Sequence, residues 1–175
     1  MTRFVFAGYA FVHFLLFLWA LNLWRRREAP GALILAIMAA GLVYDNSLIS
    51  LGRAIGIGPT LETLSWPRFI LHALVTPFLM IATLQIARTA GLEWAGKKLW
   101  QGAIWVLTLA MIVYGVVFDL LPLEIQPACV NDVVRFTSST SPSQFCFADQ
   151  TQNPGVGPPV PSIVADILII IVGVM

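Results

Sequence analysis

Residues 4–24, FVFAGYAFVHFLLFLWALNLW, decide what kind of protein this chain is. The run contains no Asp, Glu, Lys or Arg, and Arg25, Arg26 and Arg27 follow it directly. A helix needs about 20 mainly apolar residues to cross the hydrocarbon core of a bilayer, which is about 30 Å thick. The stretch therefore predicts a transmembrane helix, and its basic flank indicates the cytoplasmic end.

Three further runs have the same character: residues 32–51, 67–87 and 100–121. None alternates apolar and polar residues as the strands of a membrane β-barrel do. A fifth apolar run, residues 162–175, has about 14 residues and is too short to span alone. We therefore expect an all-α, polytopic transmembrane bundle with four full spans and a truncated or partial fifth, and we expect the chain to be a fragment of a longer protein.

Two prolines refine the third span. Pro67 is expected in the first turn of a helix, where its missing N–H costs nothing. Pro77 lies inside the same apolar run and is expected to kink the helix.

The composition excludes other classes of protein. Hydrophobic residues make up 58% of the 175 residues and charged residues only 11%, whereas soluble domains carry about 25% charged residues. The chain has ten Lys and Arg residues and nine Asp and Glu residues, so it lacks the excess of positive charge that is typical of nucleic-acid-binding proteins. Membrane lipid is the expected partner, and a homo-oligomer or a partner subunit stays open.

The positive-inside rule predicts the orientation. With residues 25–27 inside, the cytoplasmic side holds six Lys and Arg residues: Arg25, Arg26, Arg27, Arg88, Lys97 and Lys98. The outer side holds four: Arg3, Arg53, Arg68 and Arg135. This excess predicts an outside N-terminus and an extracytoplasmic loop over residues 122–161. The expected location is a plasma membrane, with an endomembrane as the alternative for a eukaryotic source.

Both cysteines, Cys129 and Cys146, lie in this predicted outer loop. Disulfides form and persist in oxidising compartments, so the pair predicts a disulfide bridge. Closing a loop of about 18 residues contributes roughly 3 kcal/mol in the chain-entropy model. A zinc site is not expected here, because the loop has no third Cys and no His.

Within the apolar runs, the acidic and imidazole side chains that lie near the predicted outer ends are Asp45, His72, Asp119 and Asp166. At 1.5 Å per helical residue they lie about 4–9 Å below the outer boundary. Ionisable groups are costly within a bilayer and therefore mark candidate functional sites. We expect them to gather with Asn46 around one outward-opening cavity, with Arg53 and Arg68 at its mouth.

The chemistry of this candidate site has three interpretations. In the first, the four titratable groups bind a divalent metal, and Asp45 and His72 act in the hydrolysis of a lipid. In the second, the groups carry protons or cations in a transporter component. In the third, Asp45 pairs with Arg53 or Arg68 and simply joins two helices. His13, deeper in the first span, is expected to form a helix–helix hydrogen bond. No cofactor is certain, and the molecular activity is left undetermined.

Overall fold

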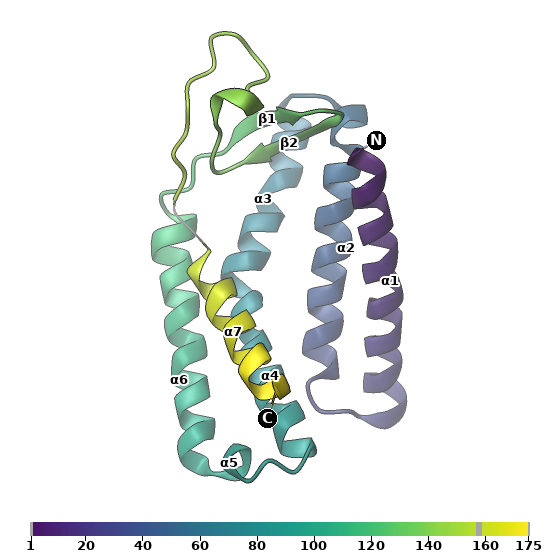
Figure 1. Cartoon of the computed structure of the whole chain (residues 1–175), viewed down its shortest axis with the longest axis vertical. Helices are drawn as coiled ribbons and strands as arrows, with labels where there is room; N and C mark the ends of the chain where they lie inside the picture. The colour runs from purple at the N-terminus through teal and green to yellow at the C-terminus, as the bar shows by residue number, and fades with distance from the viewer. Residues whose placement is uncertain (1, 157–158, 175) are drawn as a thin grey trace.

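The computed structural model describes residues 2–156 and 159–174, and it consists of long helices with a small hairpin at one end (Figure 1). The α-helices are α1 Thr2–Arg27, α2 Ala32–Ile55, α3 Pro59–Leu74, α4 Leu79–Thr89, α5 Glu93–Gly96, α6 Lys98–Tyr114 and α7 Val160–Val174. Shorter elements are the 3-10 turns η1 Thr76–Phe78 and η3 Pro142–Gln144, the π-helical segment η2 Gly115–Leu120, and the strands β1 Gln126–Val130 and β2 Val133–Thr137.

Within the described residues, four helical stretches are long and apolar enough to cross a membrane: Thr2–Arg27, Ala32–Ile55, Pro59–Thr89 and Lys98–Leu120. Only 6% of the most apolar window of the first stretch is buried inside the protein, against 44% for the third. Apolar side chains that face outward from a long helix are suited to contact with lipid. The prediction of four helices of spanning length is confirmed, and α7 corresponds to the short fifth run.

The expectation of an all-α chain is wrong in one place. Residues 126–137, expected to be loop, form an antiparallel hairpin in which Cys129 is opposite Val134 and Ala128 is opposite Arg135. Asn131 in the connection has a φ of 55°, a left-handed conformation that Asn tolerates better than most residues. β-branched residues flank this turn, with Val130 before it and Val133 and Val134 after it, and such residues favour strands.

The third span begins earlier than expected. Pro59, preceded by Gly58, occupies the first turn of α3, and Pro67 lies inside the helix. The prediction for Pro67 was therefore wrong, because α3 extends about two turns beyond the apolar run. The kink predicted at Pro77 falls where the structure interrupts the helix: α3 ends at Leu74, and the 3-10 turn η1 precedes α4.

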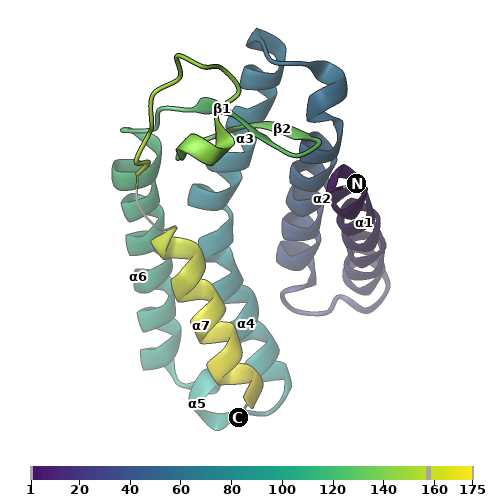
Figure 2. The same ribbon diagram turned by 45° about the horizontal axis from the view of Figure 1, so that its top comes forward.

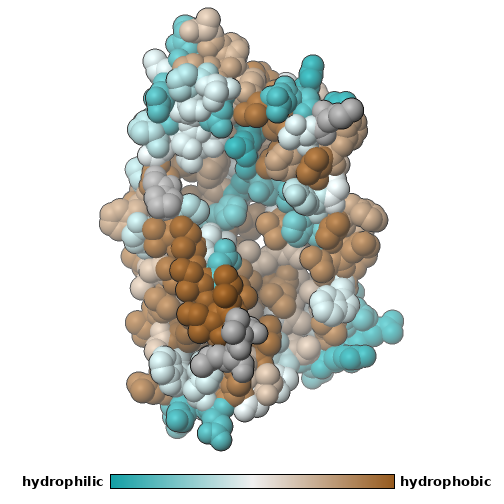
Figure 3. All heavy atoms as spheres, viewed as in Figure 1, coloured by the Kyte–Doolittle hydropathy of each residue, from teal (hydrophilic) through white to brown (hydrophobic). Residues whose placement is uncertain are grey.

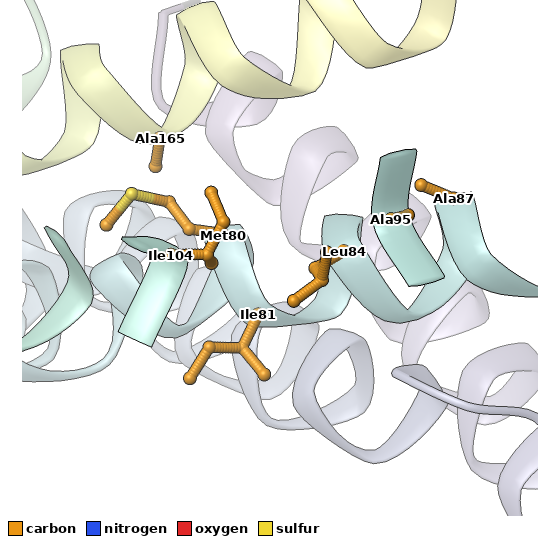
Figure 4. Packing of buried hydrophobic residues seen from close by; sticks show 7 residues of the cluster. All are labelled: Met80, Ile81, Leu84, Ala87, Ala95, Ile104 and Ala165. Atoms are coloured by element: carbon orange, nitrogen blue, oxygen red, sulfur yellow. The ribbon is translucent and has the colours of Figure 1, made fainter. Parts of the chain in front are cut away.

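Helix α4 forms the centre of the larger part of the bundle. Its buried face packs against Ala95 of α5, Ile104 of α6 and Ala165 of α7 (Figure 4). A second cluster, Leu48, Leu61 and Phe136, joins α2, α3 and β2. The hairpin is therefore anchored by apolar contacts to the ends of two helices.

The two ends of the molecule differ in character. The hairpin and the start of α1 lie at one end, and α5 lies at the other (Figures 1 and 2). Helix α1 ends with Arg25–Arg27 at the α5 end, where α4 also ends with Arg88 in its last turn. The basic clusters thus share the end opposite to the hairpin.

Candidate functional site

Arg68 joins three elements at the hairpin end of the bundle. Its Nε donates to Oδ1 of Asp45, so that α3 is tied to α2 by an ion pair. Its Nη1 donates to the carbonyl oxygen of Phe136 in β2 over 3.2 Å. The side chains of Arg68 and Asp45 are only 12% and 18% exposed. Arg53 and Arg68 were the two predicted partners of Asp45. In the structure Asp45 pairs with Arg68, whereas Arg53 is exposed.

A second guanidinium lies beside this pair. Arg135 belongs to β2, next to Phe136. Burial lowers the pKa of Arg135, the positive charge of Arg68 lowers it further, and the negative charge of Asp45 raises it. Sequence reasoning had placed Arg135 in an outer loop and gave it no role. No local sequence pattern predicts that a strand residue will lie near residues of two helices. The proximity of Arg135 to Arg68 and Asp45 is seen only once the hairpin is placed against α2 and α3.

Two cavities adjoin Arg68. The small cavity, about 20 Å³, lies between α2 and α3, and Asp45 is part of its lining. The large cavity, about 220 Å³, lies between α3, η2, the segment after β2 and the start of α7. Its polar lining consists of Arg68, His72, Asp119, Ser138 and Ser162. Arg68 and His72 line both cavities, and together they form the wall between them.

The large cavity is a polar site within apolar surroundings. Leu120 and Leu123 also line it, and neighbouring Leu121 is 75% exposed. Figure 3 shows hydrophilic surface in a recess beside the hydrophobic surface of α7. A molecule in this cavity would meet both charged and apolar side chains.

Asp119 reaches the large cavity from a π-helical turn. The N–H of Leu121 donates to the carbonyl of Val116 over 3.0 Å, which is the wider i→i+5 bond of a π-helix. A β-carbon at Gly115 would lie 3.0 Å from the carbonyl oxygen of Ala73, so the glycine allows α3 and η2 to approach closely. Single π turns are frequent at functional sites, because the wider turn redirects a side chain.

The predicted site residues are only partly brought together. Asp45 lines the small cavity and Asp119 the large one, and His72 lines both together with Arg68. Asn46 is buried, but its Nδ2 donates to Leu42 O of its own helix over 2.8 Å.

Asp166 is not part of this group. Its side chain is exposed and lines neither cavity. It lies one turn beyond Ser162 on α7, which runs from the hairpin end toward the α5 end (Figure 1).

The proposed metal ligands do not form one cluster. Among residues 2–156 and 159–174, no group of three or more His, Cys, Asp or Glu side chains could hold a metal ion. The reason is visible at Asp45, whose carboxylate is engaged by Arg68. The candidate set of Asp45, His72, Asp119 and Asp166 is therefore not assembled as a metal centre.

Two buried hydroxyl groups were missed by sequence reasoning. Thr76 lines the small cavity and Ser162 the large one. In the described part of the chain, neither Thr76 Oγ1 nor Ser162 Oγ has a hydrogen-bond partner. Ser and Thr within apolar helices usually satisfy their hydroxyls on their own backbone, as Thr108 does with Ile104 O. The sequence therefore does not show which Ser or Thr hydroxyl will lack a hydrogen-bond partner.

The remaining predictions concern His13 and the cysteines. Nδ1 of His13 lies 2.7 Å from Tyr9 O in its own helix, so the expected helix–helix bond is wrong. The predicted disulfide is present: Cys129 is bonded to Cys146, with 5.2 Å between their Cα atoms. It ties β1 to the segment after η3.

Comparison of the chain with protein-family models, with curated proteins and with solved structures gives no match.

Proposed function

We propose that the chain is a multi-pass membrane protein that binds a membrane lipid by its polar headgroup in the large cavity. The observation that carries this proposal is the lining, in which Arg68, His72 and Asp119 adjoin apolar side chains. Headgroups bring charge and hydrogen-bonding groups to the boundary of the apolar layer. Charged side chains placed at the same boundary are their natural complement, and they cost less there than at the bilayer centre.

The size of the cavity favours a headgroup over a whole lipid. Its volume is about 220 Å³, somewhat below the roughly 300–1,000 Å³ of pockets that enclose a drug-sized ligand. Acyl chains would remain outside, against exposed apolar side chains such as Phe118 and Leu121. A lipid-hydrolysing metal enzyme has less support, because the described residues do not supply a metal cluster.

We infer that the hairpin end faces the outside of the membrane. The basic clusters of Arg25–Arg27 and Arg88 share the opposite end, and the positive-inside rule assigns such an end to the cytoplasm. The disulfide at the hairpin end supports the same orientation, because disulfides persist in oxidising compartments. The headgroup would then belong to the outer leaflet of a plasma membrane, or to the lumenal leaflet of an endomembrane.

A photoreactive lipid tests the headgroup site. The purified full chain, in bilayer nanodiscs, is irradiated with a phospholipid that carries a diazirine close to its headgroup, and the labelled peptides are mapped. We expect labelling around Asp119 and Ser162, in addition to lipid-facing helix surfaces.

Ser162→Phe fills the cavity and is expected to abolish the labelling around Asp119. The matched control is Ile163→Phe, because Ile163 is 44% exposed on the next position of α7; this control should leave the labelling in place. Equal labelling around Asp119 in both variants would contradict the proposal.

A further inference from the structure

The large cavity holds charges of both signs. Arg68 and His72 come from one face of α3, since they are four residues apart. Asp119 comes from η2 and Ser162 from α7. A cavity lined by one sign of charge would select a counter-ion. This cavity instead presents a guanidinium and a carboxylate to the same occupant.

Arg68 keeps donors available for an anionic group. A guanidinium has five N–H donors, and the described residues take one from Nε and one from Nη1. Ser162 lines the same cavity, and its buried hydroxyl has no partner in the described residues. Arginine with a hydroxyl is a typical combination for phosphate oxygens, because guanidinium donors match them in pairs.

Asp119 offers the opposite complement. Its carboxylate lines the large cavity, and no described residue forms an ion pair with it, in contrast to Asp45. A carboxylate accepts hydrogen bonds and favours a cation. An ammonium group beside Asp119 would satisfy it.

The charges that line the large cavity favour an occupant that also carries both signs of charge. The charged residues Arg68 and Asp119 line the cavity, one of each sign, so its lining is neutral when His72 is neutral. A purely anionic occupant would be repelled by Asp119, and a purely cationic one by Arg68. A zwitterion avoids both costs.

We infer that the occupant of the large cavity is a zwitterionic phosphoryl–ammonium group, with the phosphoryl end at Arg68 and Ser162 and the ammonium end at Asp119. This inference rests on the proposed function and adds the class of headgroup. The source of this group is a zwitterionic phospholipid such as phosphatidylethanolamine. A soluble phosphoethanolamine ester shares this chemistry, and the experiment separates the two sources.

Native mass spectrometry of the full chain tests the inference. The delipidated protein in detergent is mixed with equal amounts of phosphatidylethanolamine and anionic phosphatidylglycerol that carry the same acyl chains. We expect the zwitterionic lipid to be retained in excess. Asp119→Asn should lower the ratio of zwitterionic to anionic adducts about tenfold, because it removes a charge-assisted contact. Asp166→Asn is the matched control and should leave the ratio unchanged.

A second variant probes the other end of the headgroup. Ser162→Ala should weaken retention of both lipids by a similar factor, because they share the phosphate. Each variant is first checked for an intact disulfide and a wild-type thermal transition. Equal retention of the two lipids by the wild-type protein, or a ratio insensitive to Asp119→Asn, would overturn the inference while leaving lipid binding in place.

Two further outcomes concern the proposed function itself. If no lipid adduct survives on the wild-type chain, the lipid proposal fails and the inference fails with it. In a separate arm, soluble phosphoethanolamine is added at the same concentration as the lipid, and we expect it to displace none. Displacement would overturn the membrane lipid as the source and retain the zwitterionic chemistry.

Discussion

The carbonyl oxygen of Val134 packs so closely against Gly52 that a β-carbon at that position would overlap it. This contact seats β2 on the last turns of α2, with the side chain of Leu61 alongside. Phe136, two residues further along β2, accepts a hydrogen bond from Arg68. The placement of the hairpin and the placement of Arg68 are therefore linked through one glycine.

Gly52→Ala is expected to destabilise the protein and loosen the hairpin. The added methyl group would meet backbone rather than a flexible side chain, and forced overpacking costs about 1–3 kcal/mol. The measurement is the unfolding transition in detergent, together with limited proteolysis of residues 122–161. Gly102→Ala in α6 is the control, because nothing lies within 4 Å of its β-carbon. It should be neutral or stabilising by up to about 1 kcal/mol. The prediction is wrong if the two variants behave alike.

Asp45→Asn and Arg68→Gln are expected to destabilise the protein singly, and the double variant less than the sum of the two. The pair is mostly but not fully buried, so each single change should cost about 1–3 kcal/mol, between the values for surface and buried pairs. A double-mutant cycle on the free energy of unfolding measures the coupling. Additive effects would show that the pair contributes no coupling between α2 and α3.

Loss of the disulfide should loosen the hairpin end without dismantling the helices. Cys129 and Cys146 are separated by 17 residues, so the chain-entropy model gives about 3 kcal/mol. The Cys129→Ser, Cys146→Ser double variant should be cleaved faster in residues 122–161 and should retain its helical circular dichroism. The chain has only two cysteines, so maleimide labelling before and after reduction reports on this bridge alone. Labelling of unreduced protein would contradict the bridge.

The orientation can be measured with matched alanines at the two ends. In the Cys129→Ser, Cys146→Ser background, Ala148→Cys places a thiol near the hairpin and Ala90→Cys places one beyond α4; both alanines are exposed. A membrane-impermeant maleimide added to intact cells should label the Ala148→Cys variant. The Ala90→Cys variant should react only after permeabilisation. The reverse pattern would show that the hairpin end faces the cytoplasm.

The sequence alone determined the four helices of membrane-spanning length, the helix interruption at Pro77 and the partnership of Cys129 with Cys146. These follow from properties that are local in the chain, namely apolar length, a missing backbone donor and the cysteine count. The position of Pro67 and the hairpin were predicted wrongly, because the polar residues around them carry weak local signals. Helix length outside the apolar layer is not fixed by hydropathy.

Only the tertiary structure decided which polar groups meet. It selected Arg68 as the partner of Asp45, brought Arg135 beside them through the hairpin, and left Asp166 exposed outside the cavities. The sequence predicts only how deep each polar group lies along its helix. Whether two groups touch also depends on how each helix is rotated about its axis. That rotation is set by packing between elements far apart in the chain, such as Gly115 against Ala73 and Gly52 against Val134.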